Sequence, residues 1–488
     1  MVRVPRLSKS RFQAGLQCPK YLWLYCYTPE IADEPDETLQ AIFDQGHAVG
    51  ELARECFPGG ALVGEDHTQS TQALHTTGQL LAKGAYCLYE AAFAHHNVFV
   101  RPDILFKDDD GNWTLVEVKS ATQPKPEYVT DIGIQAYVLR GVGLPVVRSY
   151  LLHLNSGYVY PGGPYDLGRL FTLVDLTTEV EAFQPAIPGL LEEMKELLEG
   201  PLPTVQISKR CEQPYRCSFY GSCHDFLPEF PVTEIPRVGN DLLCALLADG
   251  HYSIHDIPLG YPGLTDLQRT VCEVIQSGEP RFDPVLKQEL GRLSAPIHFL
   301  DFETYRSALP FHPGTRPYQA LPVQWSCHTL DGDLEHQEFI HTARTDPRRD
   351  FATTLLSALP GDGPVVVYSQ YESTILDSLA QDLPDLAAPT AGLQGRLFDL
   401  EKVIKNYVQH PHFHGRTSLK YVLPALVDGL SYDGLAVPTG DVAALRYGQA
   451  VFGDLDETER QAIFQDLLVY CATDTLALVR LFEQLRDR

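Results

Sequence analysis

The chain has 488 residues, 44% of them hydrophobic and 21% charged, a globular balance that excludes a disordered or fibrous protein. A chain this long is expected to divide into two or three domains. The net charge of −26 argues against tight coating of nucleic acid, but it leaves room for a local basic channel. No segment has the roughly 20 consecutive apolar residues of a membrane helix, and the first 17 residues lack the apolar core of a signal peptide. We therefore expect a soluble, cytoplasmic protein without a membrane partner.

Residues 1 to about 225 begin with helical patterns, continue through strands near 97–119 and 147–154, and end in a cysteine-rich loop. The segment 98–119 is typical of a β-hairpin, with one strand over 99–106 and a return strand over 113–119. A three-residue turn over 109–111, with Gly111 in the left-handed conformation, pairs Asp103 directly with Glu117. Because strand side chains alternate between faces, Lys119 lies on the same face as Glu117.

Two carboxylates and an ammonium at one place have a chemical use. Asp103 and Glu117 can hold Mg²⁺ or Mn²⁺ against a phosphate oxygen, and Lys119 can orient the attacking water. The plainer alternative is a surface hairpin with a cross-strand salt bridge.

The pattern Pro102-Asp103 followed by Glu117-Val118-Lys119 resembles the core motif of the PD-(D/E)XK nuclease superfamily. The opening segments, 7–10 and 18–23, are similar to the start of its RecB-like branch. The resemblance implies a restriction-endonuclease-like α/β fold for residues 1–225. It also implies that His47, on a helix, is a metal ligand and that Gln135 lies near the active site.

Four of the eleven cysteines stand apart from the scattered ones. Cys211, Cys217 and Cys223 form a C-x₅-C-x₅-C pattern in a loop, and Cys18 lies nearly two hundred residues earlier. This distribution resembles the iron–sulfur clamp of RecB-like nucleases, which implies a [4Fe–4S] cluster held by the four thiolates. The family spacing is more often C-x₂-C-x₅-C, so a zinc ion bound by four cysteines stays open as an alternative.

Residues 226–292 predict a mainly helical connector, and a new α/β pattern fills 293–488. Strands are expected at 297–300 and 365–368. A long closing helix is expected from Asp456, which forms a plausible capping pair with Glu459.

The last region holds a second group of acidic residues. Asp301 and Glu303 lie two apart near a strand end, hence on one face, and Tyr470 and Asp474 lie four apart on the closing helix. This D-x-E and Y-x-x-x-D pair resembles the DEDD exonucleases, which have an RNase H-like fold and bind two metal ions. The family aspartate that follows the fourth strand is replaced by Glu372, which we favour by order over Asp399.

The fold class expected is α/β: a PD-(D/E)XK-like domain with an iron–sulfur clamp, a helical connector and an RNase H-like domain. The whole chain also resembles a bacterial family catalogued as domain of unknown function 2779. The predicted function is a metal-dependent nuclease, acting on DNA single strands or ends, with Mg²⁺ or Mn²⁺ as cofactor. The alternative is a non-catalytic nucleic-acid-binding or assembly protein with a structural or redox cluster, or with zinc.

Overall fold

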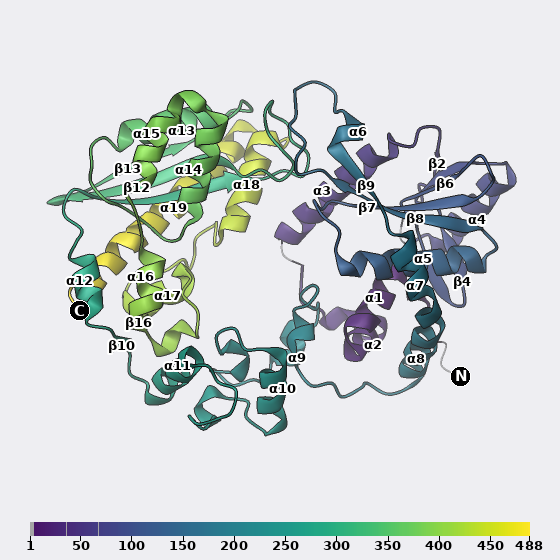
Figure 1. The fold of residues 1–488 in the computed structure, drawn as a ribbon, viewed down its shortest axis with the longest axis horizontal. Helices are drawn as coiled ribbons and strands as arrows, with labels where there is room; N and C mark the ends of the chain where they lie inside the picture. The colour runs from purple at the N-terminus through teal and green to yellow at the C-terminus, as the bar shows by residue number, and fades with distance from the viewer. Residues whose placement is uncertain (1–3, 36, 67) are drawn as a thin grey trace. The chain divides into compact units, whose positions relative to one another are not determined.

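The computed structural model describes residues 4–35, 37–66 and 68–488 (Figure 1). The chain divides into two compact units. The first comprises Met1–Phe226 and Ser307–Tyr318, and the second comprises Leu227–Arg306 and Gln319–Arg488. The segment expected as a separate connector thus groups with the second unit.

The first unit is built on a mixed six-stranded sheet with the order β2-β3-β6-β7-β8-β9, beside a small sheet with the order β1-β5-β4. Its strands are β1 (Leu7–Ser8), β2 (Ala61–Leu62), β3 (Cys87–Tyr89), β4 (Phe93–His95), β5 (Val98–Val100), β6 (Ile104–Lys107), β7 (Trp113–Lys119), β8 (Val146–Leu154) and β9 (Phe171–Asp175). Its helices are α1 (Lys9–Gln17), α2 (Pro19–Tyr27), α3 (Glu37–Arg54), α4 (Ser70–Ala82), α5 (Pro126–Gly141), α6 (Leu167–Leu170), α7 (Thr177–Phe183), α8 (Ile187–Glu199) and α9 (Tyr220–His224).

The β6–β7 hairpin has the expected turn. Lys107 pairs with Trp113, the Asp108 amide donates to the Asn112 carbonyl at 2.8 Å, and Gly111 has φ +83°. The loop therefore spans three residues with glycine in the left-handed region, where a Cβ is unfavourable. Ile104 pairs with Val116, which places Asp103 opposite Glu117.

The expectation of one strand over 99–106 is wrong. The chain makes β5 in the small sheet and β6 in the large one, with a break at residues 101–103 between them. Pro102 lies in this break, and proline cannot donate a ladder hydrogen bond. The break leaves the Asp103 side chain at the start of β6.

The large sheet separates two apolar layers because its side chains alternate between faces. Leu115 of β7 packs with residues of α1, α5 and α8 on one face, and Val116 packs with residues of α3 on the other. Glu117 follows the alternation to the α5 face. Ala308 belongs to Ser307–Tyr318, the shorter segment of this unit. It packs in the same cluster as Val49 and Ala53 of α3.

The second unit contains a five-stranded sheet with the order β13-β12-β11-β14-β15. β11 pairs antiparallel with β12, β12 antiparallel with β13, and β11, β14 and β15 run parallel. The strands are β11 (Ile297–Tyr305), β12 (Leu321–Asp331), β13 (Asp333–Ile340), β14 (Val365–Val367) and β15 (Leu397–Asp399), and a separate pair is formed by β10 (Arg281–Phe282) and β16 (Val408–Gln409).

Helices cover both faces of this sheet (Figure 1). Leu300 and Phe302 pack with α13, α14 and α15 on one face, and Phe299 packs with α12, α16, α17 and α19 on the other. The helices are α10 (Asn240–Ala248), α11 (Asp266–Ser277), α12 (Val285–Leu290), α13 (Arg348–Ala358), α14 (Tyr371–Asp382), α15 (Ala387–Gln394), α16 (Leu400–Tyr407), α17 (Leu419–Leu426), α18 (Gly440–Phe452) and α19 (Glu457–Arg486).

Helix α19 begins with a complete capping box formed by Asp456 and Glu459, as the sequence predicts. By length and composition alone it could cross a membrane, but half of its most apolar stretch is buried inside the protein. Its buried side chains include Phe482, which packs edge-on against Phe299 of β11. These contacts are those of the core helix of an α/β domain.

Candidate functional site

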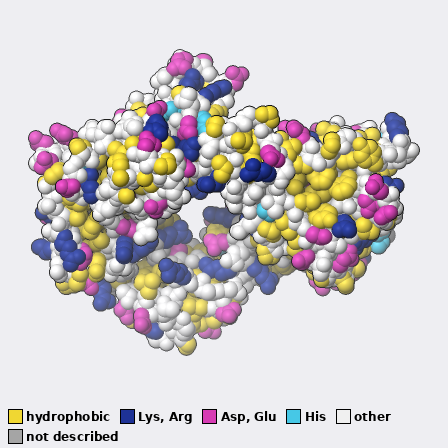
Figure 2. Space-filling view, turned by 45° about the horizontal axis from the view of Figure 1, so that its top comes forward, with side chains coloured by type: hydrophobic (Ala, Val, Ile, Leu, Met, Phe, Trp, Pro, Cys, Tyr) yellow, Lys and Arg dark blue, Asp and Glu magenta, His cyan; other side chains and the backbone are white. Residues whose placement is uncertain are grey.

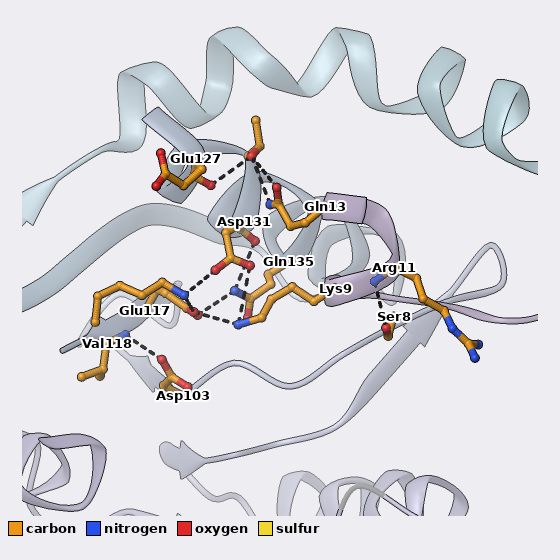
Figure 3. Close-up of polar contacts among 12 residues, drawn as sticks. Ser8, Lys9, Arg11, Gln13, Asp103, Glu117, Val118, Glu127, Asp131 and Gln135 are labelled. Atoms are coloured by element: carbon orange, nitrogen blue, oxygen red, sulfur yellow. Dashed lines mark hydrogen bonds and ion pairs between the residues drawn. The ribbon is translucent and has the colours of Figure 1, made fainter. Parts of the chain in front are cut away.

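The first candidate site surrounds Glu117 near the end of β7. The side chain is 1% exposed. Its Oε1 accepts hydrogen bonds from Lys9 and Lys119, both at 2.7 Å, and its Oε2 accepts one from Gln135 at 2.7 Å. Figure 3 shows these side chains converging from β7, α5 and the start of α1. The predicted residues Glu117, Lys119 and Gln135 are thus in contact.

Asp131 of α5 completes this arrangement. Its Oδ2 accepts from Lys119 at 2.5 Å, and its Oδ1 lies 3.6 Å from the Lys9 ammonium. Asp131 and Gln135 are four residues apart and so share one face of α5. The two carboxylates, Glu117 and Asp131, and the two ammonium groups, Lys9 and Lys119, therefore form one ion-pair network beside α5.

Asp103 lies beside the network without a direct lysine bond among the described contacts. Its Oδ2 accepts the Val118 amide at 2.6 Å. Burial and the neighbouring Glu117 raise the pKa of Asp103 to about 8. For Glu117 burial acts in the same direction, but Lys119 and Lys9 outweigh it and hold the pKa of Glu117 below its usual value.

Sequence reasoning missed Lys9, which lies 108 positions from its partner Glu117. No local pattern marks a lysine in the first turn of a helix as a site residue. Asp131 did carry a signal, since it shares a helix face with Gln135, which had been identified as a site residue.

His47 is not drawn into this group. It is exposed on α3, the helix that covers the opposite face of the sheet through Val49 and Ala53. Within the described residues, three or more His, Cys, Asp or Glu ligand atoms lie within 4.8 Å of one another only at Asp301, Glu303 and Asp474. The role of His47 as a metal ligand stays a prediction.

The four singled-out cysteines line one cavity in the first unit. Cys18 lies between α1 and α2, Cys211 ends a short 3-10 helix (Lys209–Cys211), Cys217 lies in the loop before α9, and Cys223 lies in α9. Burial, together with smaller contributions from the other three thiols, raises the pKa of Cys217 to about 11. The Phe219 amide donates to the Cys217 Sγ at 3.5 Å, an arrangement that stabilises a thiolate. The donor set therefore fits a group that binds four thiolates.

The second candidate site lies in the other unit, where β11 faces α19. Asp301 and Glu303 follow Phe299 at two-residue steps, so they point to the α19 face. One oxygen from each of Asp301, Glu303 and Asp474 lies within 4.8 Å of the others. Three predicted ligands, separated by up to 173 residues in sequence, are thus brought together.

Glu372, in the first turn of α14, adds a fourth carboxylate. It is 3% exposed, and its Oε2 has no hydrogen-bond partner. Burial and Asp399 raise the pKa of Glu372 to about 8. Asp399 itself accepts the Lys402 amide at 2.9 Å as the N-cap of α16.

The remaining carboxylates of this site are also shifted. Burial raises the pKa values of Asp301 and Glu303 well above normal, and Asp474 raises both further. Burial raises the pKa of Asp474 to about 6, although hydrogen bonds from Tyr432 and Tyr470 lower it. Tyr432 was missed by sequence reasoning because it lies 42 positions from Asp474. Such a group holds excess negative charge that a divalent cation would neutralise.

The negative net charge is not spread as one continuous surface. On the face drawn in Figure 2, basic and acidic side chains are interspersed. Near the second site, the exposed Lys420 lowers the pKa of Asp474. Local positive charge is therefore present despite the total of −26.

Part of the chain matches the model of a protein family whose role is unknown. A family model described as "Domain of unknown function (DUF2779)" matches residues 298–418, which include all of β11 except Ile297, and Glu372. No sequence among the curated proteins matches the chain.

Two solved structures are similar to parts of the chain. A structure described as "Crystal structure of SSO0001" has 13% identity and a TM-score of 0.22, and the match covers 47% of this chain and 90% of that one. The family B DNA polymerase from the hyperthermophilic archaeon Pyrobaculum calidifontis has 12% identity and a TM-score of 0.24, with 77% of this chain and 42% of the polymerase covered. Likenesses of this size carry no argument about function.

Proposed function

We propose that this protein is a metal-dependent nuclease that hydrolyses phosphodiester bonds of DNA, at single strands or ends. The observation that carries the proposal is the grouping of Asp301, Glu303 and Asp474 within 4.8 Å. Carboxylate oxygens are the ligands that Mg²⁺ and Mn²⁺ prefer. Glu372 beside them, with a buried oxygen that lacks a partner, is the orphaned atom expected where a cation belongs.

The topology of the second unit supports an RNase H-like reading of this site. Three antiparallel strands continue into two parallel ones, and the D-x-E strand lies at the centre of the sheet. The closing helix brings Tyr470 and Asp474 to that strand. This arrangement is the one expected of a DEDD-type exonuclease, with Glu372 in place of an aspartate.

The first unit supports a second, PD-(D/E)XK-like site. Asp103 and Glu117 would hold a divalent ion, which polarises the phosphate and lowers the pKa of its bound water. Lys119, bonded to Glu117 at 2.7 Å, would orient the attacking water. Gln135 fixes the other Glu117 oxygen by donating to it, which limits the side chain to one orientation.

The four cysteines that line the cavity support a [4Fe–4S] cluster, in which each iron takes one thiolate. A zinc ion bound by the same four thiolates is the alternative, and iron and zinc analysis of the purified protein decides between them.

The test is a nuclease assay on anaerobically purified protein with labelled single- and double-stranded DNA and RNA, in Mg²⁺ or Mn²⁺. Wild type is compared with Lys119→Ala, which removes the first site, and Asp301→Ala, which removes the second. Lys195→Ala and Asp333→Ala are matched controls, because both side chains are exposed.

The variant that loses cleavage identifies the unit in which the phosphodiester bond is hydrolysed. Loss in Lys119→Ala alone places cleavage in the first unit, and loss in Asp301→Ala alone places it in the second. Wild type that cleaves no substrate, with its cluster intact, would contradict the proposal.

A further inference from the structure

Helix α1 carries three long polar side chains on one face. Lys9, Gln13 and Gln17 follow at four-residue steps, and such residues line one side of a helix. We call these three residues the polar stripe of α1. The helix is fixed at its start by Ser8, whose hydroxyl accepts the Arg11 amide at 3.2 Å, and it ends at Gln17, with Cys18 as its C-cap.

The first residue of the stripe reaches the candidate active site. Lys9 donates to Glu117 Oε1 at 2.7 Å, the same oxygen that accepts from Lys119. Figure 3 shows Lys9 approaching Glu117 from the start of α1, whereas Lys119 belongs to β7. Glu117 thus has its orientation set by Lys9, Lys119 and Gln135 together.

The other two residues of the stripe attach α1 to its surroundings. Gln13 exchanges hydrogen bonds with Thr130 Oγ1 at 3.0 and 3.1 Å, and Thr130 precedes Asp131 on α5. Gln17 donates to the carbonyls of Arg210 and Tyr215 at 2.7 and 2.8 Å. These two carbonyls belong to the loop that carries Cys211 and Cys217.

We propose that Lys9 is a positioning residue for Glu117 and that the polar stripe ties its position to the folded cysteine loop. A helix of nine residues is a rod of about 14 Å, so displacement at the Cys18 end moves the Lys9 end as well. The inference rests on the proposed function, because it assigns Glu117 to the reaction.

The first arm of the test replaces Lys9. Lys9→Met keeps most of the length of the side chain and removes its charge, Lys9→Arg keeps the charge, and Lys195→Met removes an equal charge from a surface pair with Glu192. We expect Lys9→Met to lower kcat by about 10–100-fold, the usual cost of losing a residue that orients a metal ligand. KM should change little, Lys9→Arg should recover part of the activity, and Lys195→Met should match wild type.

Metal binding without substrate gives a readout that separates positioning from general damage. The Lys9 ammonium bonds the oxygen that would ligate the cation, so its removal should tighten Mn²⁺ binding measured by calorimetry. The expected fall in Kd is about fivefold (about 1 kcal/mol). A damaged site would bind Mn²⁺ more weakly. Unchanged kcat in Lys9→Met, or weaker Mn²⁺ binding, would overturn the positioning role.

The second arm replaces Gln17, which contacts the cysteine loop but is not a cysteine. Gln17→Leu should retain the iron content and visible absorbance of wild type, while kcat falls in the same direction as in Lys9→Met. The double variant should lose little more than Lys9→Met alone, because both changes act through Glu117. Unchanged kcat, or two losses that simply add, would overturn the link along α1.

Glu117→Gln separates this inference from the proposed function. Wild-type cleavage that Glu117→Gln abolishes and Lys9→Met leaves unchanged would overturn only the inference. In protein whose second site is removed by Asp301→Ala, cleavage that survives Glu117→Gln would instead remove the proposed role of the first site.

Discussion

The two acidic sites differ in how their charge is balanced, residue by residue. Lys9 and Lys119 bond to Glu117 and lower its pKa, so the first site carries its own counter-charge. In the second site burial raises the pKa values of Asp301 and Glu303 well above normal, and the neighbouring carboxylates raise them further. The second site should therefore depend more strongly on a bound cation for its stability.

Glu372 gives a direct test of that difference. Glu372→Gln removes a buried carboxyl whose pKa is raised to about 8 and keeps its shape. We expect the variant to be more stable than wild type in EDTA at pH 7 by about 1–3 kcal/mol, measured by urea unfolding. Its metal-dependent cleavage at the second site should fall. Asp333→Asn, at an exposed position, is the control, and a destabilised Glu372→Gln would contradict the argument that this buried carboxyl destabilises the metal-free protein.

Asp103 predicts the pH dependence of metal binding at the first site. A protonated carboxyl is a poor metal ligand, and the pKa of Asp103 is raised to about 8. Mn²⁺ affinity, measured by calorimetry in Asp301→Ala protein, should therefore rise roughly tenfold per pH unit up to about pH 8 and then level off. Asp103→Asn should remove most of this dependence. Affinity that is flat between pH 6 and 8 would show that Asp103 does not ligate the ion.

Site residues could be predicted from the sequence where local geometry linked them to one another. Asp103 and Glu117 could be paired because glycine at the left-handed position of the turn fixes the register of the hairpin. Gln135 and Tyr470 came from resemblance to known families. Lys9 and Tyr432 could not be found, because their contacts join distant parts of the chain and follow from the packing of α1 and α19.

At the scale of elements, a cluster bound in the cysteine cavity would join the α1–α2 junction to α9 and the loop before it. Cys217 is 8% exposed and packs with Leu24 and Phe219. A cross-link between distant positions removes entropy from the unfolded chain and so favours the folded state.

This leads to a prediction about Cys217→Ala. We expect loss of about four iron atoms per chain and a decrease in stability of about 3 kcal/mol, or roughly 6–12 °C in Tm for a unit of this size. Iron analysis and calorimetry on anaerobic protein measure both quantities. Cys244→Ala, which lies in α10 of the other unit, should keep its iron. Zinc in stoichiometric amount, with a colourless protein, would contradict the iron–sulfur assignment.

The start of a helix or strand could be predicted where one strong local sequence signal marked it. The capping box at Asp456 marks the start of α19 because its two side chains satisfy the first free amides of the helix. The prediction of one strand over 99–106 was wrong because the apolar residues of this segment are typical of a continuous strand. Pro102 interrupts the strand, and its two halves pair in two different sheets. Only the tertiary structure decides between one strand and two.

At the scale of the whole molecule, both units hold carboxyl groups that keep their protons in the folded state at pH values where an unfolded chain has lost them. The pKa is raised to about 8 for Asp103 in the first unit and to about 6 for Asp474 in the second. Where the folded state binds more protons than the unfolded state, the free energy of unfolding falls as pH rises. The metal-free protein should therefore be most stable in mildly acidic solution, below the raised pKa values and above the range of general acid denaturation.

We predict that in EDTA the free energy of unfolding decreases by about 4–9 kcal/mol between pH 5 and pH 8.5. Mg²⁺ or Mn²⁺ at saturating concentration should remove most of this decrease, because a cation bound only by the folded state stabilises it by mass action. Thermal unfolding across this pH range, with and without metal, measures the effect. The quadruple variant Asp103→Asn, Asp301→Asn, Glu372→Gln, Asp474→Asn should show little pH dependence and no response to metal. A wild-type protein that gains stability toward pH 8.5 in EDTA would mean that these carboxyls are already neutralised without a cation.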